Sequence, residues 1–227
     1  MAVGHVDFYP NGGTVQPGCE MSVSQMNPAC SHLASHVLFT DTIRNKCLYN
    51  AYPCESMDEY SKGNCLRCGP KGCNRMGYWA SPSRDVNSLY LDTQNINHSN
   101  KCTQKYQVTL ISDSHNSRKK AKGLFLIKLH THNETTTDKI LDDSETVFQP
   151  DSIETMLVSL DNHLKSENIL SSTITYKMGW DFLDYDSDWT FKNLKIFSAR
   201  YQKTFNLCPT VSRRRFDFSK STMYELC

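Results

Sequence analysis

The chain has 227 residues, of which 38% are hydrophobic, so it is long enough to bury the core of one large or two small domains. Its 25 lysines and arginines nearly balance its 24 aspartates and glutamates, which gives no electrostatic reason to expect nucleic-acid binding. No apolar run is long enough to span a bilayer, which argues against an integral membrane protein.

Ten cysteines and two N-glycosylation sequons, at residues 97–99 and 133–135, predict a protein of the oxidising secretory route. The cysteines are therefore expected to form disulfides. The first residues lack the basic and apolar parts of a signal peptide. We therefore expect the sequence to be a fragment or to lack its first exon.

Residues 5–13 predict a strand end followed by a tight turn, because Pro10 restricts φ and Asn11-Gly12-Gly13 tolerates positive φ. Asp7 is expected to stabilise this turn and not to act in catalysis. Residues 30–43 follow a helical period, and their expected apolar face is Leu33, Val37, Phe39 and Ile43.

The chemistry is expected between Cys19 and His36. Cys19 and Cys30 enclose a ten-residue loop, and His32 stands two places after the second cysteine. A histidine beside a closed surface loop can act as general base to a serine hydroxyl. The alternative is a structural histidine.

The second half of the chain has a period of two. Tyr106, Val108 and Leu110 alternate with Lys105, Gln107 and Thr109, which predicts a half-buried strand. Further strands are expected at 124–129, 156–160, 174–178 and 194–196. Short strands with polar turns between them are typical of an antiparallel β-sandwich. Residues 81–101 have the Ser, Asn and Asp content of a linker, apart from a short strand at 89–91.

Trp180, Phe182 and Leu183 lie in an expected loop between two of these strands. Large apolar side chains in water are unfavourable, so they either contact a lipid surface or fold against the local core. Both interpretations stay open.

Four cysteines, Cys54, Cys65, Cys68 and Cys73, form a second cluster. From the residues alone, this cluster predicts either a zinc site or two disulfides. A redox Cys-x-x-Cys is disfavoured because no thioredoxin-like βαβ pattern surrounds it.

Several short motifs, in this order, resemble the pancreatic-lipase family of secreted α/β-hydrolases, which includes phospholipase A1 enzymes. They are HVDFYPNGG at 5–13, PGC at 17–19, CSHLAS at 30–35, FTDTI at 39–43, YPC at 52–54, MGY at 76–78 and YLDT at 90–93. The resemblance implies a mixed fold. Residues 1–95 would be the C-terminal remnant of an α/β-hydrolase domain, 96–102 a linker, and 103–227 an all-β antiparallel sandwich of the PLAT (lipoxygenase-like) type.

By this resemblance His32 is the catalytic base, and Cys19–Cys30 closes a short lid that contains Met21, Val23 and Met26. His36 has no counterpart in the family and is expected to be structural. The family's serine lies in a G-x-S-x-G elbow, and no such pentapeptide occurs here. Because the family's aspartate also precedes residue 1, we expect this chain alone to be inactive.

The resemblance also implies disulfides Cys54–Cys65, Cys68–Cys73 and Cys208–Cys227. Cys47 and Cys102 have no counterpart in the family, so they either pair with each other or leave a thiol free. Calcium binding in the family involves a loop upstream of this segment. No metal or cofactor is therefore expected here.

The implied function is a secreted carboxylic-ester hydrolase at a lipid interface, with triacylglycerol, phospholipid or galactolipid substrates. A ten-residue lid cannot roof a wide apolar cleft, which favours substrates with polar head groups. A small protein cofactor is left open. The alternative is a non-catalytic lipid- or partner-binding protein derived from the lipase fold.

Overall fold

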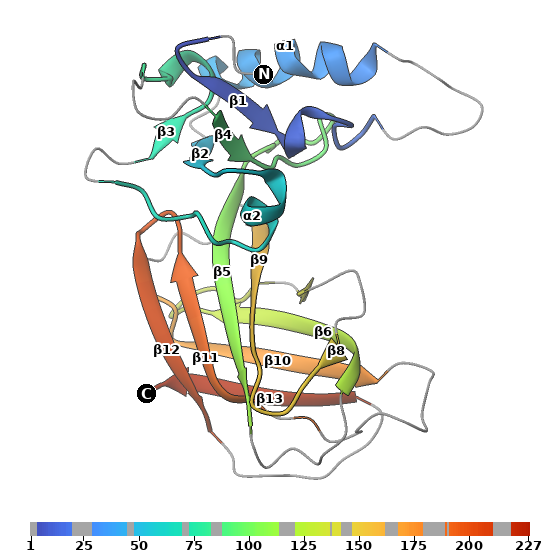
Figure 1. The fold of residues 1–227 in the computed structure, drawn as a ribbon, viewed down its shortest axis with the longest axis vertical. Helices are drawn as coiled ribbons and strands as arrows, with labels where there is room; N and C mark the ends of the chain where they lie inside the picture. Colours follow the sequence, from blue (N-terminus) through green and yellow to red (C-terminus); the bar gives the residue numbers. More distant parts are fainter. Residues whose placement is uncertain are drawn as a thin grey trace, which may run out of the picture. The chain divides into compact units, whose positions relative to one another are not determined.

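The computed structural model describes residues 4–19, 29–44, 48–69, 73–82, 88–113, 121–136, 138–141, 147–161, 168–178, 189, 191–210 and 219–227. The chain forms two compact units, residues 1–105 and 106–227 (Figure 1). The expected domain bounds, with a first domain that ends at residue 95 and a linker that ends at residue 102, stay a prediction. Within the described ranges, no helix has the length and apolar content needed to cross a membrane.

The first unit contains a four-stranded sheet in the order β1-β4-β2-β3. Strand β1 (Asp7–Pro10) pairs in parallel with β4 (Ser88–Leu91), and β2 (Asn50–Pro53) pairs antiparallel with β4 and with β3 (Asn74–Arg75). The helical segments are η1 (Asn11–Gly13), α1 (Cys30–Arg44), α2 (Met57–Ser61) and η2 (Gly77–Trp79). The buried side chains of the unit include Leu38 from α1, Ala51 from β2, and Leu89 and Leu91 from β4.

The helix expected at 30–43 is present as α1, but the prediction of its buried face was wrong. Leu33, Phe39 and Ile43 are 53%, 49% and 53% exposed. The buried residues are Ala34, Leu38, Asp41 and Thr42, on another face of the helix.

Two polar residues of α1 are buried because each has a partner elsewhere in the unit. The Tyr49 hydroxyl donates to Asp41 Oδ2 at 2.6 Å, and Lys101 Nζ lies 3.2 Å from Asp41 Oδ1. The Tyr78 amide donates to Thr42 Oγ1 at 3.0 Å. These contacts fix the C-terminal part of α1, since paired polar groups can be buried at little cost.

Most of the described residues of the second unit are in β-strands. Its strands belong to a nine-stranded sheet in the order β7-β6-β10-β13-β12-β11-β5-β9, with β8 paired to β6. The strands are β5 (Thr103–Ser112), β6 (Ala121–His130), β7 (Lys139–Ile140), β8 (Val147–Phe148), β9 (Ile153–Asp161), β10 (Ser171–Met178), β11 (Phe191–Ser198), β12 (Lys203–Pro209) and β13 (Ser219–Leu226). The pairs β6–β10, β10–β13, β12–β13, β11–β12 and β5–β11 are all antiparallel.

The sheet of the second unit curls over a core of aromatic side chains. In Figure 1, β5, β11 and β12 cross in front of β6 and β10. The two layers are in contact, because the Phe125 ring of β6 lies 5.5 Å from the Phe191 ring of β11. Phe125 also packs on Phe148 and Tyr176, with ring centroids 4.4 and 4.6 Å apart.

The alternation predicted for this half is confirmed. Tyr106, Val108 and Leu110 of β5 are buried, as are Met156, Val158 and Leu160 of β9, Ile174 and Tyr176 of β10, and Leu194 and Ile196 of β11. The described part of the chain is mostly β-sheet with few helices.

Candidate functional site

His32 lies in the first turn of α1, two residues after Cys30. Its side chain is exposed and lines a pocket of about 410 Å³. The other lining residues are Pro10, Gly13, Thr14, Gln16, Ser31, Ser35 and Leu38. An imidazole in this position can exchange protons with a group bound in the pocket. The catalytic role of His32 stays a prediction.

A disulfide closes the loop that precedes α1. Cys19 and Cys30 are bonded, with Cα atoms 5.7 Å apart. The pairing is the one that the family resemblance implied. The expected lid residues Met21, Val23 and Met26 lie outside the described residues.

Gln16 connects both ends of this loop. Its carbonyl oxygen accepts from the Cys19 amide at 2.8 Å, and its own amide donates to Ser31 Oγ at 3.1 Å. The side chain is buried as well, and its Nε2 donates to the Pro10 carbonyl at 2.9 Å. One buried residue therefore fixes the start of the loop and the residue immediately before His32.

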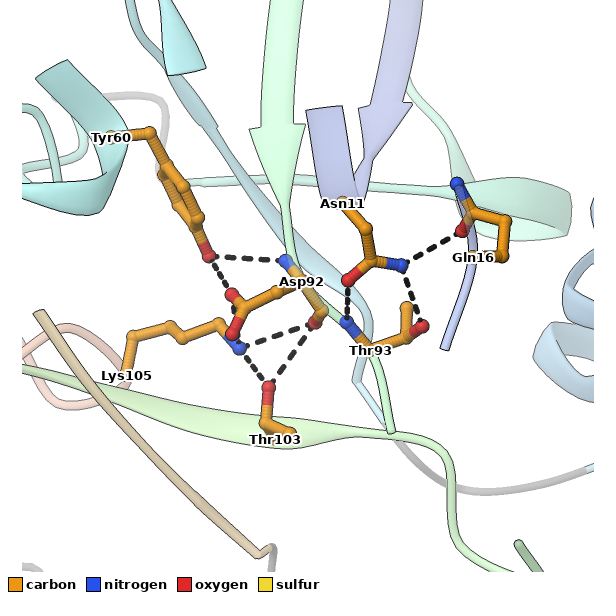
Figure 2. Close-up of polar contacts among 7 residues, drawn as sticks. All are labelled: Asn11, Gln16, Tyr60, Asp92, Thr93, Thr103 and Lys105. Carbon is orange, nitrogen blue, oxygen red and sulfur yellow. Dashed lines mark hydrogen bonds and ion pairs between the residues drawn. The ribbon is translucent and has the colours of Figure 1, made fainter. Parts of the chain in front are cut away.

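Asn11 extends these contacts to the end of β4, as Figure 2 shows. Its Nδ2 donates to Gln16 Oε1 at 2.8 Å and to Thr93 Oγ1 at 3.0 Å, and its Oδ1 accepts from the Thr93 amide at 2.9 Å. Asn11 has φ +51°, a conformation that asparagine tolerates better than most residues. The turn after β1 is thus fixed by side-chain bonds to β4.

A buried ion pair lies next to Thr93. Lys105 Nζ is 2.5 Å from Asp92 Oδ1, and the lysine side chain is only 3% exposed. The Tyr60 hydroxyl donates to the same carboxylate oxygen and accepts from the Asp92 amide at 3.1 Å. The ammonium also donates to Thr103 Oγ1 and, at 3.2 Å, to the Asp92 carbonyl (Figure 2).

Burial sets the proton affinities of this cluster. Desolvation lowers the pKa of Lys105, and the adjacent Asp92 carboxylate opposes that effect. Burial is also the main cause that raises the pKa of Tyr60 well above its ordinary value, with Asp92 adding to it. The prediction that Lys105 lies on the polar face of β5 was wrong, because Asp92 gives the ammonium a buried partner.

The pocket contains hydroxyl groups, but in the described part of the chain none donates to the His32 imidazole. Ser35 Oγ donates to the His32 carbonyl at 2.7 Å, and Ser31 Oγ accepts from the Gln16 amide. The pocket therefore holds a base whose imidazole is not engaged by a nucleophile in these residues.

The remaining cysteines form the disulfides that the resemblance implied. Cys54–Cys65, Cys68–Cys73 and Cys208–Cys227 are bonded, with Cα separations of 5.4, 4.9 and 5.3 Å. A zinc site at the second cysteine cluster is thereby excluded. Cys102 is also disulfide-bonded, and Cys47 lies outside the described residues. Trp180, Phe182 and Leu183 lie outside them too.

Gln16, Asn11, Asp92 and Lys105 were not among the functional residues that the sequence suggested. A weak signal exists for Asn11, which is the Asn of the Asn-Gly-Gly turn, but its partner Thr93 is 82 residues away. Nothing local marks Gln16 or Asp92.

The first unit thus presents a disulfide-fixed helix that carries an exposed histidine at a pocket, beside a closed loop. In comparison with known proteins, residues 1–100 match the Lipase family. Lipase member H of Rattus norvegicus is 32% identical over 161 residues, which cover 65% of this chain and 35% of that protein. Pancreatic triacylglycerol lipase of Homo sapiens is 34% identical over 145 residues, which cover 56% and 30%. The chain resembles the pancreatic lipase family, and it spans about a third of the length of these relatives.

Among solved structures, a LOX chain in complex with arachidonate aligns with a TM-score of 0.42 at 15% identity, over 53% of this chain and 16% of that one. Coral 8R-lipoxygenase aligns with a TM-score of 0.40 at 15% identity, over 53% and 17%. Scores this low carry no conclusion about this chain.

Proposed function

We propose that the chain is part of a secreted carboxylic-ester hydrolase that acts on acylglycerols or phospholipids, and that His32 is its catalytic base. The observation that carries the proposal is that the exposed His32 lines the pocket, two residues after the Cys19–Cys30 loop closes. The similarity of residues 1–100 to lipases supports the reaction class.

The proposed mechanism is acyl transfer. His32 takes the proton of a serine hydroxyl while the serine oxygen attacks the ester carbonyl, and the protonated imidazole then donates to the departing alcohol. The same imidazole next deprotonates water, which releases the fatty acid. No G-x-S-x-G pentapeptide occurs in these 227 residues. The proposal therefore assigns the serine and the orienting aspartate to sequence outside them.

The length of the Cys19–Cys30 loop affects which substrates can reach the pocket. Ten residues separate Cys19 from Cys30, and a disulfide holds the ends together. A loop of this length covers little of a wide apolar cleft, so lipids with polar head groups meet less obstruction. Phospholipid or galactolipid esters are thus proposed as substrates beside triacylglycerol. The β-rich second unit is proposed to be the PLAT-like domain of such an enzyme.

The test is His32→Ala in a protein that contains this chain and hydrolyses lipid esters. We expect ester turnover to fall at least about 10⁴-fold, because a triad without its histidine retains only binding and oxyanion stabilisation. Adsorption to phospholipid vesicles should be unchanged. His98→Gln is the matched control, since His98 is exposed and, among the residues that the structure describes, its ring bonds only to nearby Asn100.

Turnover retained by His32→Ala would refute the assignment. A native protein that adsorbs to vesicles without hydrolysing any ester would instead favour the non-catalytic lipid-binding alternative.

A further inference from the structure

The exposed side of α1 carries a second histidine beside the first. His32 and His36 are four residues apart in a continuous helix and both are exposed. Residues at this spacing lie on one helix face with Cβ atoms about 5–6 Å apart. Ala34, Leu38 and Asp41 occupy the buried side of α1, so both imidazoles point away from the packed side.

Neither imidazole is engaged within the part of the chain that the structure describes. Figure 1 draws α1 as a coiled ribbon, and contacts at its first turn and near its end hold it in place. The Cys19–Cys30 disulfide and the Gln16 amide hold its first turn, and the Tyr78 amide holds Thr42 near its end. The spacing of the two histidines is therefore set by the backbone of a helix held at both ends.

We propose that His32 and His36 form a two-histidine site for a divalent transition metal, of which Zn²⁺ is the expected ion. Zinc binds imidazole nitrogen at about 2.0–2.1 Å, and two nitrogens on one tetrahedral ion are about 3.3 Å apart. Side chains at i and i+4 of a helix reach this separation by choice of rotamer, as in helical zinc sites with His at these positions. Imidazole selects zinc, copper and nickel over magnesium and calcium.

The remaining coordination positions fall to water or to a bound anion. In the described residues, no group of three or more His, Cys, Asp or Glu side chains converges on one point. Two protein ligands give weaker binding than the four of a structural zinc site, and an open site that exchanges its metal. Such a site is suited to reversible control of the protein by the metal and less to stabilising its fold.

Metal bound at this site would control the hydrolase reaction, because His32, one of the two metal ligands, is also the proposed catalytic base. A catalytic triad uses both ring nitrogens of its histidine, one toward the serine and one toward the aspartate. A metal on either nitrogen of His32 therefore withdraws the residue from proton transfer. This consequence rests on the proposed function, whereas the metal site itself does not.

The site is tested on the 227-residue chain with its disulfides intact, titrated with ZnCl2. We expect one ion per chain by calorimetry, and ring-proton NMR signals of His32 and His36 that shift together along one binding curve. His36→Gln should weaken binding at least tenfold, since loss of even an outer-shell partner costs roughly 10- to 100-fold in affinity.

A double variant is the matched control. His36→Gln with Thr40→His keeps the number of histidines in α1 but places them eight residues apart, about 12 Å along the axis. It should bind as weakly as His36→Gln alone. Unchanged affinity in His36→Gln, or full affinity in the double variant, would overturn the site.

The regulatory consequence has a separate readout. In a hydrolytically active protein, the zinc concentration that halves turnover should rise at least tenfold in His36→Gln, relative to that variant's own zinc-free turnover. Equal zinc inhibition of native protein and variant would overturn control through this site. Zinc binding that depends on His36, in a protein without ester turnover, would refute the proposed function and leave the metal site standing.

Discussion

Lys105 and Asp92 show what decides stability at the scale of single residues. The lysine side chain is 3% exposed, and its ammonium is bonded to Asp92 and Thr103. A charge in such a place is stable only while its partner is present, because burial removes the compensation by water. The same contacts hold the hydroxyl of Tyr60.

Lys105→Met should lower the free energy of unfolding by about 3 kcal/mol, since it leaves the Asp92 carboxylate buried without its cation. Denaturant unfolding followed by circular dichroism measures the loss. The double variant Lys105→Met with Asp92→Asn should recover part of it, because the charge is then removed with its partner. A single variant as stable as the native chain would contradict this account of the pair.

At the scale of elements, the turn after β1, the loop stems and α1 form one assembly. Asn11 and Gln16 bond to each other, and through them the end of β4 is connected with the first turn of α1. The position of His32 therefore depends on residues that are not its neighbours in the sequence.

Asn11→Gly tests this assembly, because glycine keeps the positive φ and removes only the amide. Three hydrogen bonds are lost, at about 1 kcal/mol each. We expect faster amide hydrogen exchange at residues 16–19 and 30–33, with unchanged exchange in the strands of the second unit. Asn64→Gly is the control, since Asn64 is exposed and its bonds within the described ranges go to nearby Glu59. Equal effects of both variants would argue against the proposed connection.

At the scale of the whole molecule, buried tyrosines couple stability to alkaline pH. Burial raises the pKa of Tyr49, Tyr52, Tyr60, Tyr106 and Tyr224 above the ordinary value of 10.0, with nearby Asp41 or Asp92 adding to it for the first three. Above that pH the unfolded chain releases phenolic protons that the folded chain retains.

The free energy of unfolding should therefore fall as the pH rises above about 10, by up to about 1.4 kcal/mol per pH unit for each such tyrosine. Lys105 has the opposite effect on the free energy of unfolding. Because its pKa is lowered in the folded chain, its contribution makes stability rise with pH, and it does so only below the ordinary pKa of lysine. The part of the phenolate absorbance that belongs to these buried tyrosines should rise in one step with unfolding. Gradual ionisation of all the tyrosines in a folded chain would contradict the prediction.

Features that depend on local period or spacing were predictable from the sequence. The alternation of Tyr106, Val108 and Leu110 predicted β5, and the helical period after Cys30 predicted α1. The disulfides came from family motifs, which carry the spacing of their cysteines. The position of His32 beside a closed loop came from the same motifs.

Only the tertiary structure decided which side of α1 is buried, that Lys105 lies inside, and that Asn11, Gln16 and Thr93 meet. The physical reason is that burial of a polar group depends on its partner, and these partners lie far along the chain. Asn11 and Thr93 are 82 residues apart, and Asp41 and Lys101 are 60 apart. A period in the sequence shows which side chains prefer water and which prefer the core. Hydrogen bonds formed on folding determine which polar side chains are buried in spite of that preference.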